Sequence, residues 1–267
     1  CLGGTLLAIA AAAMARDGDE RLASLTMFAA QTDFTEPGEL ALFIDNSQIS
    51  LLEAQMAQTG YLTGAQMAGA FQMLRSYDLL WSRLVSEYLL GERAPMNDLM
   101  AWNADTTRMP AKMHSQYLRR LFLDDDLSEG RYPVGGKPVT LGDITLPTFM
   151  VGTVTDHVAP WRSVFKLQQL SPAEITFVLT SGGHNAGIVS PPGNPRRHYQ
   201  MLTRPASGNY LPPDAWLAAA TDTPDSWWPA WLAWLKARSG TPVKPPRTGA
   251  AAYPPVGDAP GTYVLEK

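Results

Sequence analysis

Short, continuous apolar runs alternate along this chain with stretches whose apolar residues recur at helical spacing. The strand-like runs are residues 24–30 (SLTMFAA), 146–155 (LPTFMVGTVT) and 174–180 (EITFVLT). The helical stretches around them are residues 2–16 and 161–170. Strands that alternate with helices predict a parallel sheet covered by helices. Functional groups gather at the carboxyl ends of the strands in such sheets, and Asp156 and His184 follow two of the predicted strands.

A long helical segment interrupts this alternation. Between about residues 34 and 126 the apolar positions recur at helical spacing, with Met and aromatic residues frequent, which indicates an inserted helical cap. A length of 267 residues suits one α/β domain with such an insertion. We therefore predict an α/β core over residues 1–33, a cap over 34–130, a second part of the core over 131–241 and a Pro-rich tail over 242–267.

The last third of the chain contains a Pro-rich segment and a Trp-rich segment. Residues 191–213 are rich in Pro, Gly and Arg and predict an ordered loop. Residues 226–238 (SWWPAWLAWLKAR) predict an amphipathic helix. Trp227, Trp231 and Trp234 fall at near-helical spacing, which favours core packing over a platform for substrate.

Charge and hydropathy exclude several kinds of partner. The 21 basic and 25 acidic residues give a net charge of −4, which provides no surface for nucleic acid or an anionic membrane. Charged residues make up only 17% of the chain, so part of the surface is expected to be apolar and to suit an apolar or granular partner. The longest apolar run, residues 2–14, is too short to span a bilayer and lacks the basic flank of a signal peptide.

A single cysteine excludes an internal disulfide framework and a multi-cysteine metal site, which fits the reducing cytoplasm. The acidic run at residues 124–126 lacks other metal ligands at useful spacing and is predicted to be a solvated helix end. We expect neither a metal nor a cofactor.

Cys1, Asp156 and His184 stand in the chain order of nucleophile, acid and histidine in an α/β-hydrolase. Two glycines and an apolar helix follow Cys1, as in the second half of a nucleophile elbow. His184 would take the thiol proton and Asp156 would hold the imidazole. The main-chain N–H of Leu2, at the start of the helix, is placed to stabilise an oxyanion.

Each of these residues has a structural alternative. A lone Cys is usually a small buried hydrophobe, and a His in a Gly-rich loop can make a structural hydrogen bond. Asp156 could simply cap the helix that begins after Pro160. His157 is expected to point away from Asp156 and to play a structural role or support the site indirectly.

Two histidines lie outside the predicted site. His114 falls in the cap and His198 in the basic loop, and both are expected to contact solvent or to pack.

Several longer motifs are similar to those of one enzyme family. They are CLGGT at residues 1–5, NDLMAWNADTTRMP at 97–110, YLRR at 117–120, TDHVAPW at 155–161, GGHNAGIVSPP at 182–192 and SWWPAWLAWL at 226–235. Over essentially its whole length, the chain resembles the catalytic part of class I polyhydroxyalkanoate synthases.

The resemblance implies an α/β-hydrolase fold and an acyltransferase. Such an enzyme joins (R)-3-hydroxyacyl units from coenzyme A thioesters into a polyester and releases coenzyme A. The family's nucleophile, aspartate and histidine fall on Cys1, Asp156 and His184, and the aspartate either orients the histidine or activates the hydroxyl that extends the chain. The resemblance also implies a homodimer at the surface of cytoplasmic polyester granules and a cap over the cysteine. It implies no prosthetic group.

Two departures from the family pattern stand out. Asn185 replaces an Ile found beside the histidine in many members. The strand before the nucleophile and the second oxyanion donor would lie upstream of Cys1, so the isolated stretch is expected to be inactive and poorly folded.

Three other functions remain open on the sequence. One is an α/β-hydrolase that hydrolyses esters or thioesters, since a fold does not fix its reaction. Another is an N-terminal nucleophile hydrolase that uses the amino group of Cys1 as base. The third is a granule-binding protein without catalysis that uses the Trp-rich helix.

Overall fold

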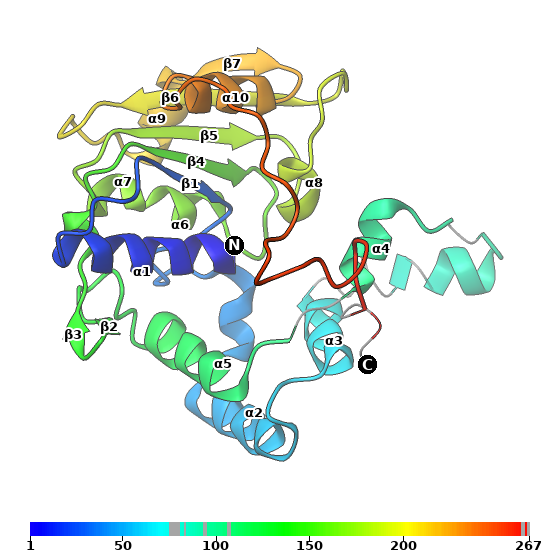
Figure 1. The fold of residues 1–267 in the computed structure, drawn as a ribbon. Coiled ribbons are helices and arrows are strands. Elements are labelled where there is room, and N and C mark those ends of the chain that lie inside the picture. The colour runs from blue at the N-terminus through cyan, green and yellow to red at the C-terminus, as the bar shows by residue number, and fades with distance from the viewer. Residues whose placement is uncertain (75–80, 83, 93–94, 106–107, 263–264, 266–267) are drawn as a thin grey trace. The chain divides into compact units, whose positions relative to one another are not determined.

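The computed structural model describes residues 1–74, 81–82, 84–92, 95–105, 108–262 and 265 (Figure 1). The chain divides into two compact units. Unit 1 comprises Cys1–Glu53 and Lys112–Ser239, and unit 2 comprises Ala54–Ala111 and Gly240–Lys267. The boundaries of these units differ from the boundaries predicted for the cap and the tail. The cap at residues 34–130 stays a prediction, because a compact unit is not by itself a cap.

Unit 1 is built on a five-stranded sheet in the order β1-β4-β5-β6-β7. The strands are β1 (Leu25–Phe28), β4 (Thr148–Thr153), β5 (Ile175–Thr180), β6 (His198–Arg204) and β7 (Thr221–Pro224). The first three run parallel, as predicted, whereas β6 and β7 are added antiparallel. The prediction of a loop over residues 191–213 is therefore wrong, because β6 lies inside it.

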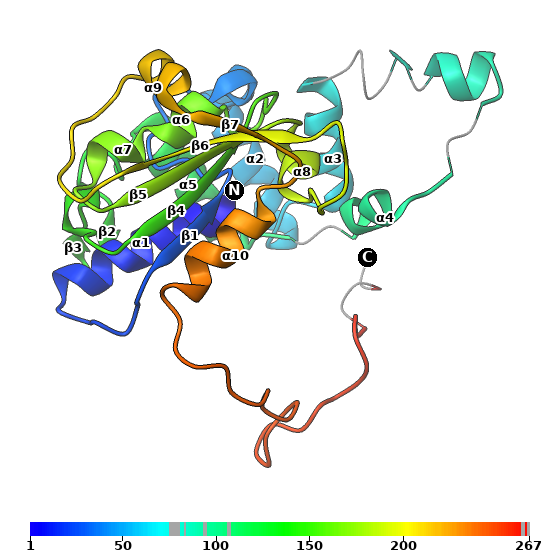
Figure 2. The same cartoon turned by 90° about the horizontal axis from the view of Figure 1, so that it is seen from above.

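Helices cover both faces of this sheet. The core on one face contains residues of α1 (Leu2–Arg16), α6 (Trp161–Phe165), α7 (Leu167–Leu170) and α9 (Pro213–Ala219). The other face is covered by α10 (Trp228–Lys236), which lies across the sheet from α6 and α9 (Figure 2). Successive strand residues point to opposite faces, so Met150 joins the first core and its neighbours Phe149 and Val151 join the second.

The segment between β1 and β4 is largely helical in its described part, as expected. Its helices are α2 (Asn46–Thr59), α3 (Gly64–Leu74), α4 (Asp98–Ala104) and α5 (Ala111–Tyr117), the 3₁₀ helices Gly38–Phe43 and Leu141–Asp143, and the π-helical turns Leu84–Leu89 and Leu118–Leu123. A short hairpin pairs β2 (Pro133–Val134) with β3 (Lys137–Pro138). Within the described ranges no helix is long and apolar enough to cross a membrane.

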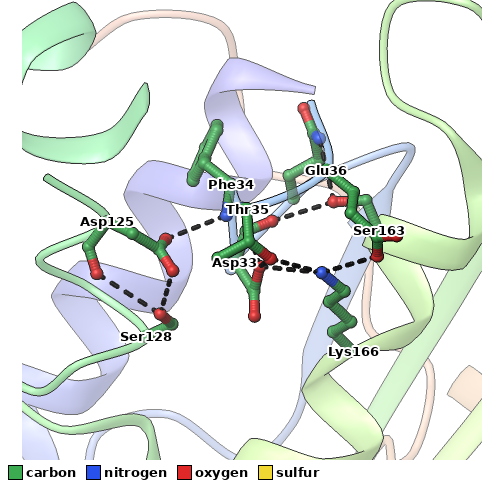
Figure 3. Close-up of polar contacts among 9 residues, drawn as sticks. Asp33, Phe34, Thr35, Glu36, Asp125, Ser128, Ser163 and Lys166 are labelled. Atoms are coloured by element: carbon green, nitrogen blue, oxygen red, sulfur yellow. Dashed lines mark hydrogen bonds and ion pairs between the residues drawn. The ribbon is translucent and has the colours of Figure 1, made fainter. Parts of the chain in front are cut away.

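The prediction of a solvated helix end at residues 124–126 holds for Asp124, the exposed C-cap residue of the turn Leu118–Leu123, but is wrong for Asp125 and Asp126. Asp125 and Asp126 are both only 9% exposed. Asp125 accepts a hydrogen bond from the main-chain N–H of Phe34 at 2.8 Å and another from the Ser128 hydroxyl (Figure 3). Burial raises the pKa of Asp125. Among the described residues no group of three His, Cys, Asp or Glu side chains could hold a metal ion.

The loop that follows β1 is also held by Ser163 of α6 and by Lys166, the residue directly after α6. Lys166 donates to the Asp33 carboxylate at 3.0 Å, and the Ser163 hydroxyl donates to the Asp33 carbonyl oxygen at 2.8 Å (Figure 3). Because Phe34 follows directly and is held by Asp125, these contacts join the start and the end of the helical segment to the core of unit 1.

Helix α1 approaches β1 closely at one of its two early glycines. A Cβ atom at Gly4 would lie 2.4 Å from the Cβ of Ala30, whereas a Cβ at Gly3 would meet nothing within 4 Å. Of the two glycines that follow Cys1, only Gly4 is therefore needed for close packing.

Gly4→Ala is expected to lower the free energy of unfolding by about 1–3 kcal/mol, because the added methyl group pushes α1 away from β1. Gly3→Ala is the matched control, since Ala is favoured over Gly in helices by up to about 1 kcal/mol and finds open space there. Urea unfolding of both variants measures the difference. Equal stability of the two variants would contradict the packing argument.

Candidate active site

Cys1 lies at the beginning of α1 and beside the end of β1. Its carbonyl oxygen accepts hydrogen bonds from the N–H groups of Gly4 at 3.1 Å and Thr5 at 3.2 Å, so it occupies the N-cap position of the helix. Its nitrogen donates to the Phe28 carbonyl oxygen at 2.7 Å. The residue is exposed, and the N–H of Leu2 is the first of the helix, where no intrahelical carbonyl can serve it.

Asp156 lies in the turn after β4, and its carboxylate is satisfied by four donors. One oxygen, Oδ1, accepts the main-chain N–H groups of Val158 at 2.9 Å and Ala159 at 2.8 Å. The other oxygen, Oδ2, accepts the Thr153 hydroxyl at 3.0 Å and contacts His184 Nδ1 at 2.8 Å. The side chain is 0% exposed.

These contacts decide the charge of Asp156. Burial alone raises the pKa of the carboxyl, but the hydrogen bond and charge of His184, with the N–H groups of Ala159 and Val158, outweigh burial and hold the pKa below its ordinary value. Asp156 is therefore ionised at neutral pH. Asp156 does not cap α6, so the structural alternative is wrong: the N-cap residue of that helix is Pro160, and no side chain caps it. Asp156 instead binds two N–H groups of the preceding turn and contacts the histidine.

His184 is the first residue of α8 (His184–Ile188), which follows β5 and the turn at residues 181–183. An ionised carboxylate at Nδ1 requires that nitrogen to carry the proton, which leaves Nε2 as the basic nitrogen. The side chain is 22% exposed. The imidazole therefore has one nitrogen fixed by a buried anion, and the side chain is partly exposed.

Cys1 lies at the same edge of the sheet as Asp156 and His184, because its main-chain nitrogen contacts the carbonyl oxygen of Phe28, the last residue of β1. The structure thus brings all three predicted residues to the carboxyl edge of the parallel strands, where β1, β4 and β5 end.

The other histidines lie in different surroundings. His157 is half-buried beside Asp156, and its supporting role stays a prediction. His114 is buried in α5, where burial lowers its pKa. His198 begins β6 and contacts the exposed Asp222 at 3.1 Å.

Sequence reasoning missed two contributions to the site. Thr153 ends β4 and donates to the same Asp156 oxygen that contacts His184, and its place three residues before the aspartate was the only signal. Trp227 and Trp228 donate from their indole nitrogens to carbonyl oxygens of α8, which no local pattern indicated.

Residues 1–191 match the family of the alpha/beta hydrolase fold. The chain belongs to the α/β-hydrolase family. Its parallel strands and covering helices agree with that membership, which confirms the fold class predicted from the sequence. In this α/β-hydrolase the residues Cys1, Asp156 and His184 follow the family's chain order of nucleophile, acid and histidine.

The α/β-hydrolase chain is similar over its length to curated polymerases, which confirms the resemblance drawn from its motifs. It is 43% identical to the poly(3-hydroxyalkanoate) polymerase of Methylorubrum extorquens, over 100% of this chain and 44% of the relative. It is 43% identical to the poly(3-hydroxyalkanoate) polymerase subunit PhaC of Rhizobium meliloti (strain 1021), over 99% of this chain and 42% of the relative. The subunit PhaC of Cupriavidus necator is 36% identical over 100% of this chain and 46% of its own length. The chain thus spans less than half the length of these relatives.

Proposed function

We propose that the full-length gene product containing this chain is a polyhydroxyalkanoate synthase, which joins (R)-3-hydroxyacyl units from coenzyme A thioesters into a polyester. The observation that carries the proposal is the buried, ionised Asp156 at 2.8 Å from Nδ1 of His184, at the sheet edge where Cys1 begins α1. The names of the relatives supply the substrate class.

In the first half-reaction His184 acts as the base for Cys1. Nε2 takes the thiol proton, and the thiolate attacks the thioester carbonyl carbon. The negative charge that develops on the carbonyl oxygen is stabilised by the N–H of Leu2 at the helix N-terminus. The carbon–sulfur bond to coenzyme A breaks, its thiolate takes the proton from His184, and the acyl group remains on Cys1. One thioester replaces another, so little free energy is lost in the exchange.

In the second half-reaction the hydroxyl group that extends the polyester chain attacks the acyl thioester on Cys1. His184 again serves as the base and takes the proton of this hydroxyl group. Asp156 is unsuited to take this proton, because all its lone pairs accept hydrogen bonds and its side chain is fully buried. Its lowered pKa also makes it a weak base. We assign Asp156 to orienting His184 and stabilising the imidazolium in both steps. The new ester bond forms as Cys1 leaves and recovers a proton from His184.

The place of the reaction in the cell and the assembly of the protein are part of the same proposal. Unit 2 exposes large apolar side chains, among them Trp81, Tyr88, Leu89 and Trp102, which supports work at a cytoplasmic polyester granule. We also propose that residues 34–130 form a cap and that the protein is a homodimer. The proposed reaction uses neither a metal nor a prosthetic group.

The test uses the full-length gene product and (R)-3-hydroxybutyryl-coenzyme A. We expect release of coenzyme A, growth of polymer, and an acyl group on the peptide that contains Cys1, none of which forms with Cys1→Ala. Free 3-hydroxybutyrate without polymer would make the protein a thioesterase instead. Residues 1–267 alone are expected to be inactive, because hydrolase-fold enzymes take a second oxyanion donor from a loop upstream of the nucleophile.

A further inference from the structure

The helix that carries His184 is very short and receives hydrogen bonds from another helix. α8 contains five residues, so its last carbonyl groups have no partner within the helix. The indole N–H of Trp227 donates to the Gly187 carbonyl oxygen at 3.0 Å, and that of Trp228 donates to the Ile188 carbonyl oxygen at 2.9 Å. Two consecutive tryptophans, 40 residues further along the chain, thus bind the C-terminal end of α8, where the Ile188 carbonyl oxygen also accepts the main-chain N–H of Ser190 at 3.0 Å.

Trp227 is held rigidly, which makes it a fixed point for α8. It is 1% exposed and belongs to the core beneath α10. Its ring lies 5.2 Å from that of Phe28 and 5.9 Å from that of Trp231, measured between ring centroids. A buried side chain with such neighbours occupies a single rotamer, so its N–H has a defined direction. A role as a platform for substrate is excluded for Trp227 by its burial.

Helix α8 also packs against β4. A Cβ atom at Gly187 would lie 2.5 Å from Cγ2 of Thr153, so the main chain of α8 packs directly on that side chain. Thr153 also donates to Asp156, the partner of His184. The helix therefore contacts both the residue that fixes Asp156 and the two indole donors.

We propose that Trp227 and Trp228 are positioning residues for His184. Their indole N–H groups hold the C-terminal end of α8, and thereby keep the imidazole aligned with Asp156. The role in turnover rests on the proposed function, in which His184 is the base. The alignment itself does not depend on which reaction the protein catalyses.

Helix α10 contains an internal control for this proposal. Trp234 also packs in this core, where its ring lies 5.5 Å from that of Phe149, but its buried indole nitrogen has no hydrogen-bond partner in the described structure. Replacing Trp by Phe removes an indole N–H and keeps an aromatic ring. At Trp227 and Trp228 that change removes a hydrogen bond to α8, and at Trp234 it removes none.

The experiment compares Trp227→Phe, Trp228→Phe and Trp234→Phe in the full-length gene product. The first readout is the downfield proton resonance of the hydrogen bond between His184 Nδ1 and Asp156, assigned by its loss in His184→Ala. We expect this resonance to shift upfield or broaden in the first two variants and to stay unchanged in Trp234→Phe. Coenzyme A release should fall about tenfold in each of the first two, because small misplacements of a catalytic group cost one to two orders of magnitude.

The outcomes separate this inference from the proposed function. A thermal unfolding curve of each variant shows how much stability is lost. If Trp228→Phe loses stability while the resonance and the turnover stay at wild-type values, the tryptophans are only structural and the inference is wrong. An equal change of the resonance in Trp234→Phe would also overturn it. If the wild-type protein releases coenzyme A but forms no polymer, the proposed function fails, while the resonance still decides whether the tryptophans position His184.

Discussion

Asp156→Asn is expected to lower turnover about 10⁴-fold and to leave the fold intact. The amide oxygen can still accept the N–H groups of Val158 and Ala159, as Oδ1 does now. The amide nitrogen replaces Oδ2 and donates to His184 Nδ1, so the proton of the imidazole moves to Nε2. The nitrogen that should receive the thiol proton is then occupied, and the base is lost without loss of packing.

Coenzyme A release under saturating substrate measures this effect, with Asp125→Asn as the matched control. Asp125 is a second buried aspartate of unit 1, and it accepts hydrogen bonds from Phe34 and Ser128, outside the network of His184. The control is expected to keep wild-type turnover even if its stability changes. Turnover within tenfold of wild type in Asp156→Asn would show that the carboxylate does not set the tautomer of His184.

The same variant changes the acid stability in a defined direction. The pKa of Asp156 is lower in the folded protein than its ordinary value, so its ionised form stabilises the fold above about pH 4. That contribution is lost as the pH falls through the folded pKa. The stability difference between the wild type and Asp156→Asn should therefore shrink below about pH 4 in urea titrations.

Periodicity predicted the parallel core because its two central strands are buried on both faces. β4 and β5 are buried at every position, and such strands give continuous apolar runs in the sequence. The pairing of Asp156 with His184 followed from the same pattern, since neighbouring parallel strands end at the same edge of the sheet. The family membership confirms the fold class.

The antiparallel edge could not be predicted in the same way. β6 (HYQMLTR) has one buried position, and β7 (TDTP) has none, so neither gives an apolar signal. The burial of Asp125 in the acidic run was missed for a different reason. The N–H group that Asp125 accepts belongs to Phe34, 91 residues away in the chain, so local composition does not show that this carboxylate is buried.

The contacts that fix α8 are likewise tertiary. A sequence shows that residues 226–235 contain four tryptophans, but not which indole groups donate and to what. Trp227 was predicted to pack in the core, and it does so. Its hydrogen bond to Gly187 depends on α10 lying beside α8, which no spacing within either segment indicates.

Gly187→Ala is expected to lower turnover about 100-fold, because displacement of a catalytic group by about 1 Å costs that much. The new methyl group would lie 2.5 Å from Cγ2 and 3.0 Å from Cβ of Thr153, closer than carbon atoms can approach. Either α8 moves and carries His184 with it, or Thr153 moves and releases Asp156. Ala is a better helix former than Gly, so the expected loss of about 1–3 kcal/mol in unfolding free energy is steric in origin.

Gly183→Ala is the matched control, because it adds the same methyl group directly before His184. There the new Cβ would lie 3.7 Å from the nearest atoms, the carbonyl and hydroxyl oxygens of Thr155, which is an ordinary contact. Turnover and stability should therefore stay close to wild type in Gly183→Ala and fall together in Gly187→Ala. If both variants lost activity equally, the loss would come from the new bulk near the substrate. If neither lost activity, the packing of α8 on Thr153 would not control the position of His184.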